Sequence, residues 1–356
     1  MKNKNQFLKG RGAQINPANK YHKLVYDENP VDWEQMEPDE DINIKTQIIE
    51  VHPKTIVNKV PSPDIPLEYS MNPYQGCEHG CIYCYARNSH QYWGYSAGLD
   101  FEQKILVKKN APQLLAEQLK SPKWKAATIM LAGNTDCYQP IERKLRITRQ
   151  ILEVFWKYRH PVGIITKNSL VLRDLDILKQ MASENLVSVA VSVTSLDESL
   201  RQFLEPRTAS AVNRLRVIRE LSKNGVPSFA MMAPIIPGLN DHEIFDLAKA
   251  TSEAGALGAG FQIVRLNGEI AGIFEDWINR TFPDRAEKVL NKIRECHNGS
   301  LGSSRFKARM KGEGNIAEII KSQFGLAHKK YFAGRKMPKL NMELHENYKG
   351  GQLKLF

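Results

Sequence analysis

Cysteine is scarce in this chain of 356 residues: there are five, and three of them stand within eight positions. This distribution does not suit a disulfide framework, and it indicates a reducing compartment in which thiols are free to bind metal. No apolar stretch reaches the roughly 18 residues that a membrane-spanning helix needs. The basic start of the chain has no apolar run behind it, so no secretory signal is expected. We therefore expect a cytoplasmic protein with no membrane partner.

Acidic residues are outnumbered by basic ones, 39 against 50, which gives a net charge of +11. A surplus of this size favours polyanionic partners, with DNA or RNA first, although a basic surface can also simply aid solubility. Basic residues gather in residues 1–25 and after residue 300, whereas residues 27–44 carry eight acids and no base. Such charge blocks are typical of a poorly packed arm, which Tyr21 and Trp33 could anchor.

The hydrophobic pattern divides the chain into three parts. We expect a polar N-terminal extension over residues 1–60, a core over residues 61–300 and a basic C-terminal extension over residues 301–356. Within the core, short apolar runs rich in β-branched residues alternate with amphipathic stretches. The runs are residues 67–71, 127–133, 162–166, 186–193, 227–233 and 259–264, and the clearest helical patterns are residues 141–158, 171–182 and 210–225.

Six strands that alternate with helices predict an α/β fold, because parallel strands need helical crossovers. Six units fall short of the eight of a complete TIM barrel, so we predict a partial (β/α)6 TIM-type barrel. Ser210 is expected to cap one helix, and Gly225 to follow its end. Asn240 with Glu243 three positions later predicts a capping box at the start of the next helix.

Residues 71–90, MNPYQGCEHGCIYCYARNSH, carry the motif C-x-x-x-C-x-x-C with Cys77, Cys81 and Cys84. Three neighbouring thiolates can each bind one iron of a [4Fe–4S] cluster. The fourth iron then has no protein ligand, so the amino and carboxylate groups of S-adenosylmethionine (SAM) could chelate it. One-electron reduction would cleave SAM to methionine and a 5′-deoxyadenosyl radical, which abstracts hydrogen from a substrate.

Other uses of the three cysteines fit less well. A structural zinc site needs four ligands, and although His79 or His90 could supply the fourth, the chain has no second C-x-x-C pair. A disulfide would leave one of the three thiols unpaired. A non-catalytic protein that binds an iron–sulfur cluster or zinc remains an alternative hypothesis.

The cysteine spacing resembles the signature of the radical SAM superfamily, in which an aromatic residue precedes the third cysteine. That residue is Tyr83 here, and the resemblance places it against the adenine of SAM, although an ordinary packed aromatic is the alternative. Residues 67–265 are similar to the spore photoproduct lyase-like branch, often called DNA repair photolyases, through NPYQGCEHGCIYCYAR, TDCYQPIE, TKNS, LEPRTAS and APIIPGLND. The N-terminal KGRGAQINPANKY resembles the opening of an uncharacterised subgroup of that branch.

The resemblance implies a radical SAM enzyme with a [4Fe–4S] cluster, SAM and an electron donor such as flavodoxin or ferredoxin. In barrels of this kind, the chemistry gathers where the strands end. Asn134, Thr135 and Asp136 follow the second strand, where the family binds the amino group of SAM, although an Asx turn also explains Asp136.

Polar residues follow the later strands too. Lys167 ends the third strand and could pair with the SAM carboxylate. Ser192 and Thr194 end the fourth and suit the ribose, or cap the strand. Arg265 follows the sixth strand.

Two further residues have open roles. Cys137 could donate hydrogen to a substrate radical, because true spore photoproduct lyases use a separate cysteine for that step; a small buried residue without chemistry is the alternative. Arg207 could contact SAM or a phosphate, or form a surface ion pair with Glu205.

The leading hypothesis is a radical SAM enzyme that acts on DNA or RNA, in a photolyase-like repair or a modification. Radical modification of a protein or metabolite is the second hypothesis.

Overall fold

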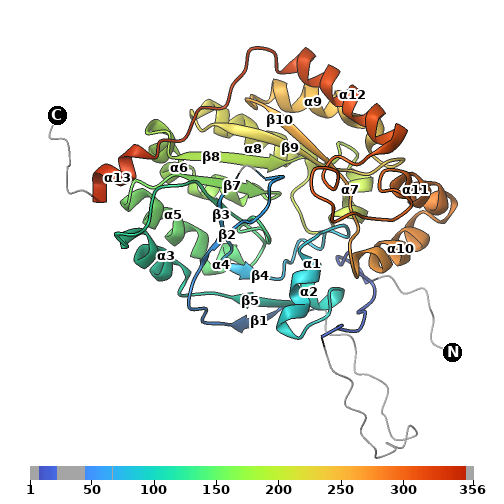
Figure 1. Cartoon of the computed structure of the whole chain (residues 1–356), viewed down its shortest axis with the longest axis horizontal. Helices are drawn as coiled ribbons and strands as arrows, with labels where there is room; N and C mark the ends of the chain where they lie inside the picture. Colours follow the sequence, from blue (N-terminus) through green and yellow to red (C-terminus); the bar gives the residue numbers. More distant parts are fainter. Residues whose placement is uncertain (1–7, 22–44, 66, 350–356) are drawn as a thin grey trace, which may run out of the picture.

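The computed structural model describes residues 8–21, 45–65 and 67–349. Its main element is a seven-stranded sheet with the order β10-β9-β8-β7-β6-β3-β2 (Figure 1). The strands are β2 (Val57–Lys59), β3 (Tyr69–Met71), β6 (Ile129–Leu131), β7 (Val162–Thr166), β8 (Val187–Ser192), β9 (Ser228–Ile235) and β10 (Ala259–Ile263). The six strands from β3 to β10 pair in parallel, and β2 adds an antiparallel edge. All six predicted strands form, and the predicted α/β fold is confirmed.

Helices follow the parallel strands and cover the outside of the curved sheet (Figure 1). The covering helices are α3 (Ala111–Lys120), α5 (Ile147–Lys157), α6 (Leu175–Ser183), α8 (Ala211–Lys223) and α9 (Ile244–Glu253). Their apolar faces bury residues such as Leu115, Phe155 and Leu221 against the strands. Among the described residues, no strand pairing joins β10 to β2, so the sheet stays open between them.

The remaining elements lie around this layer. A small sheet has the order β1-β5-β4. Its strands are β1 (Gln47–Glu50), β4 (Tyr74–Gln75) and β5 (Lys104–Val107). Short helices occur in the connections along the chain: α1 (Arg87–His90), η2 (Gln91–Trp93), α2 (Leu99–Gln103), α4 (Glu142–Leu145), η3 (Ser169–Asp174), α7 (Glu198–Leu204) and η4 (Asp241–Glu243). The C-terminal helices are α10 (Ile270–Thr281), α11 (Pro283–Glu295), α12 (Gly314–Tyr331) and α13 (Glu343–Lys349). No helix in the described ranges is long and apolar enough to cross a bilayer.

One predicted helix is interrupted. The single helix expected over residues 141–158 breaks at Arg146, which has a φ of 52°. The buried Glu142 explains the restart, because its carboxylate accepts the backbone N–H of Thr148 (3.1 Å) at the start of α5. The N-cap expected at Ser210 is confirmed by its bond from Asn213 N, and Gly225 takes the expected left-handed conformation with a φ of 71°.

The capping box predicted for Asn240 and Glu243 does not form. The Asn240 amide accepts from Ile236 N (2.6 Å) and donates to Thr194 O (2.8 Å). Glu243 accepts from the Ser195 hydroxyl (2.7 Å). These side chains hold the loop after β8 against the loop after β9, because both loops have backbone groups that lack ladder partners.

Part of the polar N-terminal segment packs onto the fold. Residues 8–21 lie beside α1 and α2 (Figure 1), and Tyr21 stacks on Tyr92 with 5.0 Å between ring centroids. Trp33 and the acidic block at residues 27–44 lie outside the described residues. The division into two extensions and a core stays a prediction.

Candidate active site

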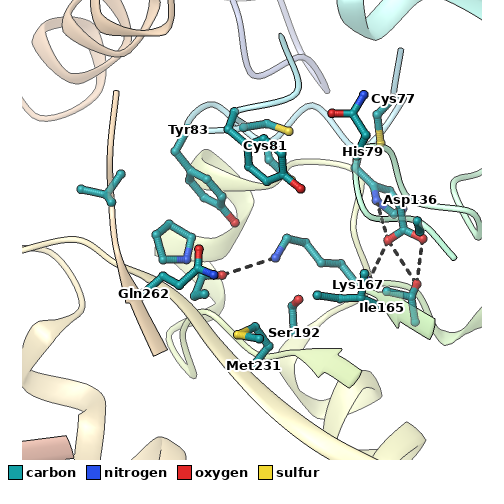
Figure 2. A pocket seen from close by; sticks show the side chains of 18 of the residues that line it. Cys77, His79, Cys81, Tyr83, Asp136, Ile165, Lys167, Ser192, Met231 and Gln262 are labelled. Atoms are coloured by element: carbon teal, nitrogen blue, oxygen red, sulfur yellow. Dashed lines mark hydrogen bonds and ion pairs between the residues drawn. The ribbon is translucent and has the colours of Figure 1, made fainter. Parts of the chain in front are cut away.

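A cavity of about 200 Å³ lies where the parallel strands end (Figure 2). It is lined by the segment after β4 and by residues at the ends of the strands from β6 to β10. The lining residues that the sequence singled out are Cys77, Cys81, Tyr83, Cys84, Asn134, Asp136, Lys167, Ser192 and Arg265. Residues up to 188 positions apart therefore meet in one place, because parallel strands bring their carboxyl ends to the same edge of the sheet.

The three cysteines of the motif all line this cavity. Cys77 and Cys81 are buried and Cys84 is half-buried. Burial raises the pKa of the Cys81 thiol, and it raises that of Cys84 to about 11. A cluster needs these groups as thiolates, and the charge of bound iron reverses such a shift.

The chain turns sharply before two of the cysteines, at Gly76 (φ of 81°) and Gly80 (φ of 68°). A side chain at Gly76 would meet Lys104 O at 2.8 Å. Glycine is required at Gly76 because the loop packs there against the backbone of Lys104. Both Gly76 and Gly80 also have a left-handed φ, which glycine adopts freely.

A buried ion pair supports this loop from beneath. Arg87 and Glu102 are fully buried and 2.5 Å apart. Arg87 Nε donates to Cys81 O (3.0 Å), and the Glu102 carboxylate accepts from the backbone of Gly12 (3.0 Å) and Ala13 (2.8 Å). The RGA of the N-terminal segment thus belongs to the support of the cysteine loop, which its polar composition did not reveal.

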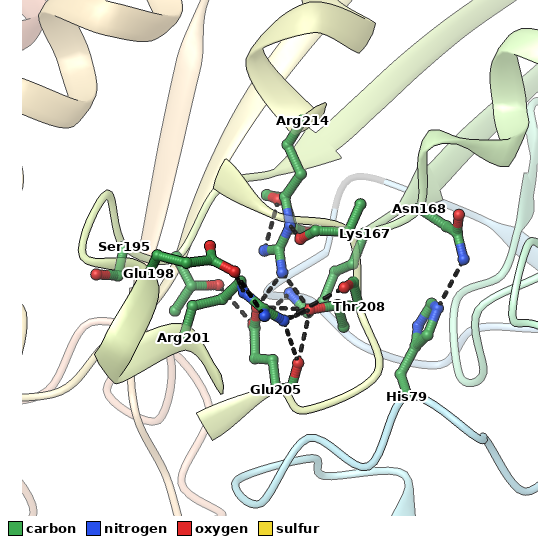
Figure 3. Close-up of polar contacts among 12 residues, drawn as sticks. His79, Lys167, Asn168, Ser195, Glu198, Arg201, Glu205, Thr208 and Arg214 are labelled. Carbon is green, nitrogen blue, oxygen red and sulfur yellow. Dashed lines mark hydrogen bonds and ion pairs between the residues drawn. The ribbon is translucent and has the colours of Figure 1, made fainter. Parts of the chain in front are cut away.

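A second buried carboxylate, Glu205, binds Tyr83 and Lys167. Figure 3 shows Glu205 among Lys167, Thr208 and Arg214. The Tyr83 hydroxyl donates to it, and Lys167 Nζ lies 3.5 Å from its Oε1. Arg214 also pairs with it, and Thr194 donates to it at 2.8 Å. Burial alone would raise the pKa of Glu205, but Arg214 and Lys167 hold it well below its usual range. Lys167 reaches into the cavity, with Nζ 5.9 Å from the centre of the Tyr83 ring.

A third carboxylate, Asp136, lies against the cysteine loop. It pairs with His79 Nδ1 (3.4 Å) and accepts from Thr166 Oγ1 (2.9 Å) and Lys167 N (2.8 Å). Burial alone would lower the pKa of His79, but Cys77 and Asp136 raise it to about 10. Asp136 thereby ties the ends of β6 and β7 to the loop between the first two cysteines.

The other predicted site residues divide by position. Asn134 lines the cavity, and its amide donates to Ser89 Oγ (3.1 Å); Ser192 also lines it. Thr135 does not line it, because its hydroxyl is buried on Tyr74 O (2.6 Å). Thr194 also lies behind the lining, on Glu205.

Cys137 does not line the cavity either. It is fully buried in the main apolar core, and burial raises the pKa of its thiol. A hydrogen donor must reach the substrate, so this position favours the alternative of a small buried residue. The donor role stays a prediction.

The ion pair considered between Arg207 and Glu205 does not form. Arg207 lies 3.4 Å from Glu78, while Glu205 is held by Arg214 and Lys167. The buried position of Glu205 explains the difference, since it faces the cavity wall and not the surface.

Comparison with known proteins identifies the superfamily of this fold. A family model for the radical SAM superfamily matches residues 71–251. An uncharacterised protein of Mycobacterium tuberculosis is 34% identical over 70% of this chain and 73% of its own. An uncharacterised protein of Methanocaldococcus jannaschii is 30% identical over 70% of this chain and 90% of its own.

More distant similarities have named functions. A radical SAM Nalpha-GlyT isomerase of Pseudomonas phage M6 is 26% identical over 54% of this chain and 38% of its own. A spore photoproduct lyase variant, solved with bound SAM and dinucleoside spore photoproduct, has a TM-score of 0.62. It is 17% identical and aligns over 85% of this chain and 86% of its own, so the likeness is one of fold.

Proposed function

Since this chain belongs to the radical SAM superfamily and is therefore an enzyme of that kind, we propose that Cys77, Cys81 and Cys84 hold a [4Fe–4S] cluster at which SAM is cleaved. When bound, the cluster supplies the electron that divides SAM into methionine and a 5′-deoxyadenosyl radical, which abstracts hydrogen from a substrate. The observation that carries the proposal is the placement of all three thiols on one cavity at the ends of the parallel strands.

The other lining residues bind and orient SAM in this proposal. Lys167, held beside Glu205, takes its carboxylate, and Asn134 and Asp136 lie where its amino group would be bound. Tyr83 packs against the adenine, because Glu205 fixes its hydroxyl. Ser192 is available to the ribose. Thr135 and Thr194 support these residues from behind.

Part of the cavity lining is apolar. It includes Ile165, Met231, Ile263 and Val264. A carbon radical abstracts hydrogen from whatever lies against it, so an apolar wall restricts the reaction to the bound substrate.

We further propose that the substrate is a nucleic acid and that the reaction is a repair or modification of it. The net charge of +11 supports this, as does a basic loop in which half-exposed Phe306 lies among Arg305, Lys307 and Arg309. Aromatic and basic side chains together bind single strands. The dinucleoside in the lyase structure gives further support. Flavodoxin or ferredoxin in a reducing cytoplasm would supply the electron.

Anaerobic reconstitution tests the central proposal. Wild-type protein should bind about four irons and four sulfides per chain and should form 5′-deoxyadenosine from SAM after reduction. The triple variant Cys77→Ala/Cys81→Ala/Cys84→Ala should do neither. Cys296→Ala is the matched control, because Cys296 is also buried but lies outside the cavity. A triple variant that still binds the full cluster would refute the assignment.

A second measurement tests the nucleic-acid part. Binding of labelled single-stranded DNA and RNA should weaken steeply between about 50 and 200 mM salt. Contacts with phosphates release counterions into solution, and this release is less favourable when the salt concentration is high. Protein that forms 5′-deoxyadenosine but binds neither nucleic acid would point to a protein or metabolite as the substrate.

A further inference from the structure

Arg265 lines the cavity immediately after β10 and is half-buried. Among the described residues, its guanidinium makes no hydrogen bond and no ion pair. It lies over the ring of Tyr85, whose centre is 5.8 Å from Arg265 Cζ. A partly desolvated charge without a partner is unfavourable, so a residue of this kind is expected to have an external partner.

The charge of Asp64 favours the protonated form of Arg265, but no hydrogen bond or ion pair joins the two side chains. Asp64 accepts from Arg309 Nε (2.6 Å) and from the backbone of Lys307 (2.6 Å), so its charge is already paired. Burial and the neighbouring Arg309 both lower the pKa of Arg265. Arginine nevertheless stays protonated in proteins, so the positive charge persists at this wall.

The other cationic side chains that line the cavity, Lys167 and His79, both pair with carboxylates. Lys167 is paired with the fully buried Glu205 at 3.5 Å. Asp136, the carboxylate that lines the cavity, is paired with His79 and bonded to Thr166. Arg265 is therefore the lining cation, within the described part of the chain, that forms no ion pair with a protein carboxylate.

The surroundings of Arg265 indicate the shape of the partner. Tyr85 is 51% exposed, and its hydroxyl donates to Gly133 O, which fixes the ring. A guanidinium presents a planar set of donors that matches two oxygens of a phosphate. A flat ring beside it suits a planar group attached to that phosphate.

We propose that Arg265 binds a phosphate of the substrate strand at the cavity wall, beside Tyr85, so that the reacting nucleotide enters toward Cys84 and Lys167. This rests on the proposed function, because it presumes a nucleic-acid substrate. It adds the residue that determines where the strand is anchored.

Oligonucleotide binding by the reconstituted protein tests this assignment. The probe is a fluorescein-labelled single strand of about 12 nucleotides, which covers one typical single-strand site. Arg265→Gln should weaken binding about 10- to 100-fold at low salt, in line with one lost hydrogen-bonded contact to a charged phosphate. It should also reduce the slope of log affinity against log salt by about 0.7. Arg265→Lys should restore the slope but not the full affinity, since lysine keeps the charge without the fork.

Arg219→Gln is the matched control, because Arg219 is an exposed residue of α8 outside the cavity. It should leave affinity and slope unchanged. A methylphosphonate strand, which lacks the charges, should bind wild type and Arg265→Gln equally weakly. Circular dichroism checks that the variants are folded.

Three results would overturn the proposal. The first is an unchanged salt slope in Arg265→Gln. The second is weaker SAM binding in that variant with unchanged oligonucleotide binding, which would assign Arg265 to the SAM carboxylate. The third is wild-type protein that binds no oligonucleotide. Formation of 5′-deoxyadenosine by wild type is scored separately, so a failure of Arg265 is distinguishable from a failure of radical SAM chemistry.

Discussion

Replacing Glu205 by glutamine removes the negative charge of a carboxylate that binds Tyr83, Thr194, Lys167 and Arg214. Glu205 is fully buried and pairs with Arg214, which is 1% exposed, and with Lys167 at 3.5 Å. Glutamine has nearly the same shape, so the substitution leaves no cavity. Its effect therefore measures the electrostatic contribution, because Arg214 stays buried without a compensating charge.

The expected cost is large. Removing one partner of a buried ion pair lowers the free energy of unfolding by about 3–5 kcal/mol, whereas an exposed pair contributes about 0–1 kcal/mol. Glu220 pairs with Lys223 on the surface of α8 at 3.4 Å, so Glu220→Gln is a matched control in the lower range. The double variant Glu205→Gln/Arg214→Met should regain about 2 kcal/mol or more of the loss, because it also removes the stranded cation.

Anaerobic urea denaturation of the reconstituted protein, followed by circular dichroism, provides the measurement. The pKa of Glu205 lies below its usual 4.5, so wild type should keep this stabilisation above pH 4.5 and lose it as the pH falls further. The variant should lack that acid-dependent component. A loss below about 1 kcal/mol in Glu205→Gln would show that the network contributes no more than a surface pair.

Two further predictions concern the periphery of the site and the base of the sheet. Gly12→Ala would place a Cβ 1.8 Å from Gly80 O, so the bound cluster should be lost to a chelator several times faster; Gly272→Ala, with open space around it, should behave as wild type. Burial, then His345, lower the pKa of His160 to about 3. This residue alone should therefore lower the stability by about 1.4 kcal/mol per unit as the pH drops below 6.5, since the unfolded state takes up the proton first. Burial also lowers the pKa of His90, to about 4, so His160→Gln should reduce the slope by this amount without abolishing it. Urea titrations of wild type and variant measure the difference.

The strands and the cysteine loop could be predicted from the sequence because both depend on local signals. β-branched runs mark the six parallel strands, and C-x-x-x-C-x-x-C sets three thiols on one segment. The supports of the loop could not be predicted, because they depend on pairings between distant segments. Gly12 meets Glu102 across 90 positions, and Tyr83 meets Glu205 across 122. The sequence allows a surface ion pair for Glu205, whereas tertiary packing buries this carboxylate.

The cysteine loop is irregular, so few of its polar groups have partners in a helix or sheet. Three carboxylates from different parts of the chain bind the loop instead: Glu102 through Arg87, Asp136 through His79, and Glu205 through Tyr83. The negative charge of each carboxylate is paired with a neighbouring cation: Arg87, His79 and Arg214, respectively. These carboxylates therefore add no net negative charge beside the thiolates. A loop held in this way is ordered before any ligand binds, and binding energy need not be used to order it.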